Sequence, residues 1–162
     1  MITIEKKSLR VGEYVNNDHV DMVIRTYKQE RWVHNSERIG KEDSLSTWYS
    51  VEELEDFIAT AKSHGADGIK FYFAAYPADF RKVPEYADRQ SLVLVATKSR
   101  EAANGSTVNK DIYCTTEGNP QILAYNMGKI CPPQCGGTFA DSDLGDLGIT
   151  IVDRGENGLS MI

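Results

Sequence analysis

The chain lacks both a long hydrophobic run and an uninterrupted apolar segment near its start. A helix that crosses a bilayer needs about 20 consecutive apolar residues, and no segment approaches that length. Five charged side chains interrupt residues 1–15, unlike the apolar core of a secretory signal: Glu5, Lys6, Lys7, Arg10 and Glu13. We therefore expect a cytoplasmic protein without a membrane partner.

Basic residues are in the minority and lie scattered along the chain. There are 18 Lys and Arg against 24 Asp and Glu, which gives a formal net charge of -6. Nucleic-acid binding draws its affinity from clustered Lys and Arg, so we expect no nucleic-acid partner. The acidic balance suits solubility, and it would also suit an inhibitor or immunity-type protein that covers a basic surface of a partner.

Cysteine and histidine are scarce, with three residues of each. An odd number of cysteines in a chain of this size does not predict a disulfide framework, so we expect reduced thiols. None of His19, His34 and His64 stands in a recognised nucleophile motif, and the sequence has no complete catalytic triad or phosphate loop. This absence leaves enzymatic activity undecided and favours a protein that is not an enzyme.

The composition is that of a folded domain. The chain has 162 residues, of which 41% are hydrophobic and 26% charged, enough for one ordinary core. No repeat or linker divides it, so we expect a single globular domain over residues 1–162. The economical architecture is α+β, a mostly antiparallel sheet with at least two helices packed on it.

Two segments predict helices. Ser50 and Glu53 have the spacing of a capping box, which predicts a helix over 51–64 that stops at Gly65. The predicted apolar face of this helix consists of residues at helical spacing: Val51, Leu54, Phe57, Ile58 and Ala61. The segment 18–31 is amphipathic, with Asp18 as its expected cap. Residues 33–47 predict an ordered loop between the helices, and Trp32 and Trp48 on either side are expected to be core anchors.

Two apolar runs predict strands, over 69–76 and 92–97. Neither run has a consistently polar face, so we expect both in the middle of a covered sheet. Shorter patches at 111–114, 121–125 and 148–152 predict edge strands or brief helical turns.

The connection between the two strands, residues 77–90, is the first candidate binding region. It is longer than a hairpin needs, and loops of this length are often functional. Tyrosine-lined surfaces suit recognition, although tyrosines on sheets also serve as packing residues and loop charges as solvated ones. The candidate binding residues are Tyr72, Tyr76, Asp79, Arg81 and Tyr86.

The second candidate region is the run 130–137, Ile-Cys-Pro-Pro-Gln-Cys-Gly-Gly, which places two thiols, two prolines and two glycines in one loop. Cys131, Cys135 and Cys114, with one of the three histidines, could complete a zinc site, although a second closely spaced ligand pair is missing. A thiol redox pair and plain burial of the cysteines are the alternatives.

With Gly68-Ile69-Lys70-Phe71-Tyr72-Phe73, the run 92–95, Asn126-Met127-Gly128 and the cysteine loop, the chain resembles a family of small uncharacterised bacterial proteins. The resemblance covers roughly two thirds of the chain. It implies a single soluble domain and carries over no catalytic or binding residues, since that family has no assigned activity.

Three functions remain open from the sequence. The favoured one is a non-enzymatic module that binds a small ligand or a protein partner where the loop 77–90 meets the loop 130–137. The second is a zinc- or thiol-dependent protein using Cys131 and Cys135. The third is the acidic inhibitor already described. No cofactor is expected apart from the zinc of the second function, and the sequence does not indicate the oligomeric state.

Overall fold

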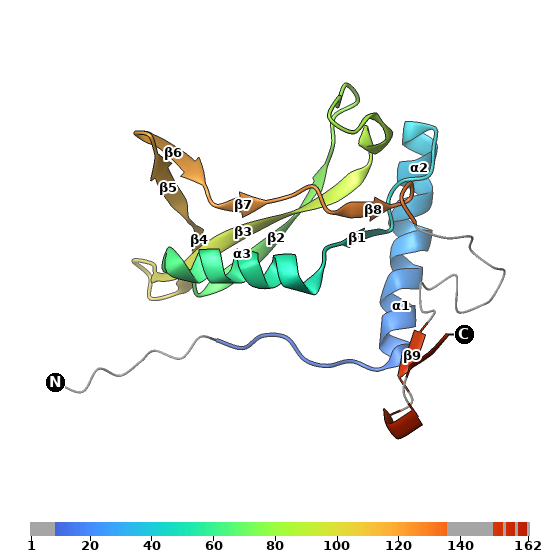
Figure 1. Cartoon of the computed structure of the whole chain (residues 1–162), viewed down its shortest axis with the longest axis horizontal. Coiled ribbons are helices and arrows are strands. Elements are labelled where there is room, and N and C mark those ends of the chain that lie inside the picture. Colours follow the sequence, from blue (N-terminus) through green and yellow to red (C-terminus); the bar gives the residue numbers. More distant parts are fainter. Residues whose placement is uncertain (1–8, 136–150, 154, 158, 162) are drawn as a thin grey trace.

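The computed structural model describes residues 9–135, 151–153, 155–157 and 159–161, and it has an α+β fold (Figure 1). The fold class predicted from the sequence is confirmed. The main sheet has the order β2-β3-β4, and β7 pairs with β3 on the β4 side. Its strands are β2 (Gly68–Ala75), β3 (Gln90–Glu101), β4 (Thr107–Asp111) and β7 (Ala124–Tyr125). All strand pairs among the described residues are antiparallel.

Short two-stranded sheets lie around the main sheet. β1 (Ser46–Trp48) pairs with β8 (Lys129–Cys131), and β5 (Tyr113–Thr116) forms a hairpin with β6 (Asn119–Ile122). Near the C-terminus, β9 (Ile151–Asp153) pairs with β10 (Leu159–Met161), and the short helix η4 (Gly155–Asn157) connects them. The predicted patches at 111–114 and 121–125 are strands, whereas most of 148–152 lies outside the described residues.

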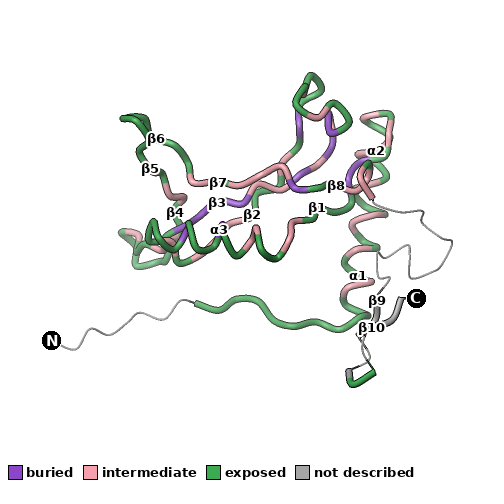
Figure 2. The backbone as a smooth tube through the Cα atoms, in the orientation of Figure 1, coloured by how far each residue is buried: buried purple, intermediate pink, exposed green. Residues whose placement is uncertain are grey.

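β3 is the central strand, and β2 lies at an edge of the described sheet. Leu94, Val95 and Ala96 of β3 are buried, and Figure 2 shows this stretch as the longest buried part of the strand. In contrast, Phe71 and Phe73 of β2 are 56% and 85% exposed. The prediction that both strands are central is correct for β3 and wrong for β2, because an apolar run alone does not show whether a strand has neighbours on both sides.

One long helical segment stands beside the sheet (Figure 1). It comprises α1 (Asn17–Tyr27), a π-helical turn η1 (Lys28–Trp32) and α2 (Val33–Ile39). The side chain of Asn16, rather than the predicted Asp18, caps it and accepts a hydrogen bond from the backbone N–H of His19 at 3.0 Å. The loop predicted for 33–47 is therefore wrong over 33–39. Neither Gly nor Pro interrupts the helix before Gly40, whose φ of 74° ends it.

The two tryptophans differ in their environment. Trp32 is partly buried, and its indole N–H donates to the backbone carbonyl of Asp43 at 2.8 Å, which fixes the loop after α2. Trp48 is 59% exposed, so the prediction of a core anchor is wrong for this residue. The ammonium group of Lys129 lies 5.3 Å from the centre of its ring instead.

Helix α3 (Val51–Ser63) confirms the predicted helix and its capping box. The Glu53 N–H donates to Ser50 Oγ at 3.1 Å, and the Ser50 N–H donates to Glu53 Oε2 at 2.8 Å. The helix packs through Phe57, whose ring stacks on that of Tyr125 with 5.4 Å between centres. Val51 remains 74% exposed, so the buried face is narrower than the predicted apolar face.

No helix in the described part of the chain is both long and apolar enough to cross a membrane.

Candidate functional site

Two of the predicted binding residues, Tyr76 and Tyr86, lie in the core. They are 8% and 4% exposed, and they form a cluster with Ile130. The Tyr76 ring stacks on Phe80 at 4.5 Å and lies 5.5 Å from the Tyr86 ring. Tyr86 belongs to the short helix η2 (Pro84–Tyr86), and its hydroxyl donates to Gln134 Oε1 at 2.7 Å. Little of either ring remains for a ligand.

Asp79 and Arg81 are exposed on the connection after β2, and no hydrogen bond or ion pair involves either side chain among the described residues. Tyr72 lies elsewhere, on β2. Its hydroxyl donates to Asp111 Oδ2 at 2.7 Å, and Lys70 Nζ donates to Asp111 Oδ1 at the same distance. This network joins β2 to β4 across β3.

Because of the Asp111 network, the stability of the fold should depend on pH in the acid range. Hydrogen bonds from Lys70, and then from Tyr72, lower the pKa of Asp111. A carboxyl group whose pKa is lower in the folded chain than in the unfolded chain stabilises the fold at any pH above its unfolded-state pKa. This stabilisation is lost as the pH falls through its folded-state pKa. At about pH 6, wild type should therefore unfold at a higher urea concentration than Asp111→Asn. The difference between the two urea midpoints should shrink below about pH 4.

Urea titrations at several pH values check this expectation. Asp79→Asn, which removes an exposed carboxylate without a described partner, serves as the control and should leave the midpoint unchanged at each pH. A difference between wild type and Asp111→Asn that stays constant from about pH 6 to about pH 3 would rule out the proposed linkage.

The two cysteines of the predicted loop form a disulfide. Cys131 and Cys135 are joined with a Cα–Cα distance of 4.6 Å, so the expectation of reduced thiols is wrong for these two cysteines. The peptide bonds before Pro132 and Pro133, between the two cysteines, are both cis. Gly136 and Gly137 of the same loop lie outside the described residues.

The predicted zinc ligands are not gathered in one place. Cys114 is a free thiol on β5, which lies at the opposite end of the molecule from β8 and Cys131 (Figure 1). Within the residues that the structure describes, no three His, Cys, Asp or Glu side chains are grouped so that they could hold a metal ion.

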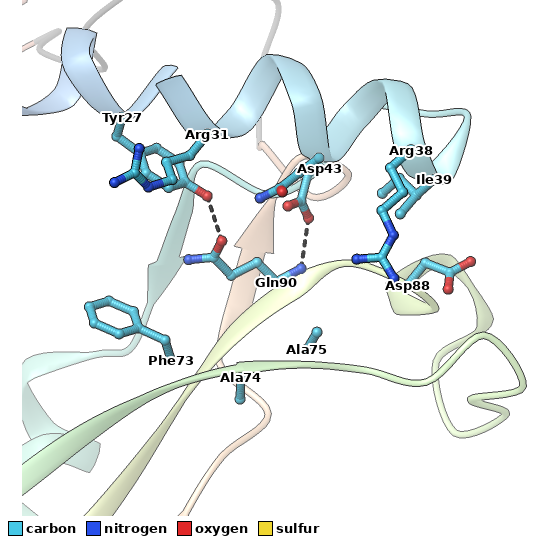
Figure 3. A pocket seen from close by; sticks show the side chains of 11 residues that line it. Tyr27, Arg31, Arg38, Ile39, Asp43, Phe73, Ala74, Ala75, Asp88 and Gln90 are labelled. Carbon is cyan, nitrogen blue, oxygen red and sulfur yellow. Dashed lines mark hydrogen bonds between the residues drawn. The ribbon is translucent and has the colours of Figure 1, made fainter. Parts of the chain in front are cut away.

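A groove between the long helical segment and the ends of β2 and β3 is the candidate site, and we call it the helix–sheet groove. It comprises two adjoining cavities of about 590 and 270 Å³. Tyr27, Phe73 and Gln90 line both cavities. Figure 3 shows the first cavity, with helical side chains above and the sheet residues Phe73 and Ala75 below.

The larger cavity is polar along its helical wall. Tyr27, Arg31, Asn35 and Arg38 follow one another at intervals of four, four and three residues, which places them on one side of a helix. No described carboxylate lies within ion-pair distance of either guanidinium group. In Figure 3 the carboxylate of Asp88, which also lines this cavity, is turned away from Arg38.

Asp43 fixes the base of the groove. It is 3% exposed, and its Oδ1 accepts the backbone N–H groups of Ser44 at 2.8 Å and Gln90 at 2.7 Å. The Ser44 hydroxyl in turn donates to the backbone carbonyl of Gln90. These bonds hold the segment after α2 against the start of β3, so both walls of the groove have a defined spacing.

Tyr27 connects the helical wall to the sheet through its hydroxyl group, which donates to Gln90 Oε1. Burial, and then the negative charge of Asp43, raise the pKa of Tyr27 above its ordinary value. The phenol is therefore neutral at physiological pH and acts as a hydrogen-bond donor to Gln90.

The smaller cavity is mainly apolar. Its walls combine apolar side chains from the helix, the following loop and the sheet with a few backbone and hydroxyl groups, and the apolar members are Val23, Ile24, Leu45, Phe73 and Leu92. The groove thus has a polar end, lined by two guanidinium and two carboxylate groups, and an apolar end.

This groove was not predicted from the sequence. The interval from Tyr27 to Arg38 was a usable signal, but the predicted helix ended at Arg31 and left Asn35 and Arg38 in a loop. Of the predicted region 77–90, Asp88 and Gln90 line the larger cavity.

Comparison with known proteins returned no family model, curated protein or solved structure that matches this chain.

Proposed function

We propose that this chain is a binding module that holds a small amphipathic ligand in the helix–sheet groove. The ligand carries one anionic group, a carboxylate or a phosphate, next to an apolar body. The observation that carries this proposal is that Arg31 and Arg38 line one cavity, and neither guanidinium forms an ion pair with a described carboxylate.

The polar end offers two guanidinium groups to an anion, beside the carboxylates of Asp43 and Asp88. Asp43 Oδ1 already accepts two backbone N–H groups, so this oxygen is engaged within the protein. A guanidinium presents several N–H groups in a fixed plane that fits a carboxylate or phosphate. Arg31 donates only a long bond of 3.4 Å to the backbone carbonyl of Glu30, which leaves its other donors for a ligand.

The apolar end supports an amphipathic ligand. The combined groove has the dimensions of small-molecule sites, which range from about 300 to 1,000 Å³. A short alkyl chain or an aromatic ring would cover Phe73, which is otherwise 85% exposed. Burial of that ring would contribute to affinity alongside the ionic contact.

The proposal keeps the predicted binding role and moves its location. It uses Asp88 and Gln90 at the end of the predicted loop 77–90 and none of the predicted tyrosines. It requires no catalytic step, no metal ion and no thiol chemistry. The cytoplasmic location stays a prediction, and the Cys131–Cys135 disulfide favours an oxidising compartment instead.

Fluorescence titration with anilinonaphthalene sulfonate tests the proposal, because this probe joins a sulfonate to an aromatic body. We expect saturable binding at one site and displacement by decanoate, with much weaker displacement by the neutral decanol. The double variant Arg31→Gln/Arg38→Gln should raise the dissociation constant of the probe by about tenfold or more, since it loses charge-assisted hydrogen bonds.

Arg81→Gln is the control for the loss of a guanidinium group, because it removes one such group from the loop 77–90 that the sequence predicts as a binding region. It should bind the probe like wild type. If Arg81→Gln weakens binding while the double variant does not, the ligand site lies on the loop and the groove proposal is wrong. Equal displacement by decanol and decanoate would remove the anionic group from the proposal.

A further inference from the structure

The outer edge of β2 has backbone groups that no strand among the described residues pairs. β2 pairs with β3 along its whole length, from Gly68 opposite Thr97 to Ala75 opposite Gln90, and no other described strand pairs with it. Exposed strand edges are sites where another chain can add a strand. The position of β2 therefore raises the question of which chain would pair there.

The hydrogen bonds of the sheet show which backbone groups of β2 face outwards. The N–H of Ala96 donates to Leu123 O and its carbonyl accepts from Ile112 N–H, so both groups point away from β2. Along an antiparallel strand, the backbone N–H and carbonyl groups of successive residues point alternately to one side and to the other. The backbone groups of the even-numbered residues of β2 therefore face β3. The Tyr76 N–H, which donates to Arg89 O at 3.0 Å, continues this pattern. The N–H and carbonyl groups of the odd-numbered residues face outwards: Ile69, Phe71, Phe73 and Ala75.

The side chains along this edge are unusually apolar for an edge strand. Phe71, Tyr72 and Phe73 are 56%, 41% and 85% exposed. Natural edge strands usually carry free charges, prolines or bulges that prevent pairing. The strand has one charged residue, Lys70, and its ammonium group lies 2.7 Å from Asp111 Oδ1 in an ion pair within the same chain. None of the usual protections is present in β2.

We propose that β2 pairs antiparallel with β2 of a second copy of this chain, around a two-fold axis at Tyr72. In this register Phe71 lies opposite Phe73 of the second copy, and Ile69 lies opposite Ala75. The outward backbone groups of all four odd-numbered residues are then paired, which no shifted register achieves over the length Gly68–Ala75.

A second copy is the partner that fits this strand because the strand is complementary to itself. The two-fold axis places Phe71 and Phe73 of both copies on one face, where they form two aromatic cross-strand pairs. Lys70 faces the opposite side of the sheet and meets Ala74 of the second copy, so no like charges are opposed.

Sedimentation velocity over a range of protein concentrations tests the dimer. Wild type should sediment as a dimer, and Phe71→Lys should raise the dimer dissociation constant by about tenfold or more, because both aromatic pairs lose a partner and gain a charge. Phe71 does not line the described cavities, so this variant should still bind anilinonaphthalene sulfonate. Tyr113→Lys, at a 64% exposed aromatic on β5, is the matched control and should remain dimeric.

Cysteine cross-linking tests the register in a Cys114→Ser background. Tyr72 lies opposite itself as a non-hydrogen-bonded pair, where Cα atoms are about 4.5 Å apart and a disulfide can form. Tyr72→Cys should therefore give a covalent dimer on oxidation, whereas Phe71→Cys should not cross-link to itself. A wild type that is monomeric at all concentrations, or a dimer that Phe71→Lys leaves intact, would overturn the proposal. Self-linking of Phe71→Cys without Tyr72→Cys would overturn the register.

Discussion

Leu94→Ala should lower the free energy of unfolding by about 3 kcal/mol, one of the two largest effects expected for a single substitution in this chain. Leu94 is 1% exposed and lies on β3 with Phe71 opposite on one neighbouring strand and Tyr125 opposite on the other. Truncation to alanine removes buried apolar contacts and leaves a cavity that the paired strands cannot easily close. Urea unfolding at fixed protein concentration measures the change.

Val51→Ala provides the matched control for Leu94→Ala. Val51 belongs to the predicted apolar face of α3, yet it is 74% exposed. Its truncation should change stability by no more than about 0.5 kcal/mol. Equal losses for the two variants would contradict the placement of the core around β3, because they would require Val51 to be buried as well.

Asp43→Ala should destabilise the chain by about 2–4 kcal/mol and also abolish ligand binding in the groove. The substitution leaves the backbone N–H groups of Ser44 and Gln90 without their acceptor at a site that is 3% exposed. An unsatisfied buried donor costs roughly 1–3 kcal/mol. Because these bonds also set the spacing between the helical wall and the sheet, the groove should lose its shape together with its support.

Asp43→Asn separates the hydrogen-bonding role of this side chain from its charge. The amide oxygen can still accept the two backbone N–H groups, so this variant should retain most of the stability that alanine loses. It should also bind anilinonaphthalene sulfonate at least as well as wild type, because a negative charge near the ligand is removed. Thermal unfolding and the fluorescence titration give both readouts. Equal instability of Asn and Ala variants would show that the charge, and not the acceptor, holds the loop.

Local sequence signals predicted the elements that depend on local chemistry. Helix α3 follows from the capping box of Ser50 and Glu53, and both hydrogen bonds of that box are present. The strands β2 and β3 follow from their apolar, β-favouring residues. The α+β class then follows because strands and amphipathic helices need each other to cover their apolar faces.

Features that depend on tertiary contacts were not readable from sequence. The segment 33–39 has no strong helical periodicity, and it continues the helix because the residues before it already form one. Trp48 looked like a core residue by type, but its exposure is decided by which strand covers β1. The edge position of β2 depends likewise on which strands pair with it.

The candidate site, too, depends on tertiary contacts that local sequence signals do not show. The loop 77–90 was chosen for its length and charge, yet its tyrosine is needed for the core and its exposed charges contact nothing described. The groove residues Arg31 and Asp43 lie far apart in sequence from Phe73 and Gln90, and no local pattern relates them. The disulfide was missed because thiol pairing depends on the path of the backbone between Cys131 and Cys135.

A nitrogen-15 NMR titration of the protein with decanoate tests ligand binding in the helix–sheet groove directly. Binding there should give saturable shift changes confined to the groove, with the largest at the side-chain N–H of Arg31 and Arg38 and at the backbone N–H of Gln90. Shift changes centred on Asp79 and Arg81, or no saturable change at any residue, would contradict it.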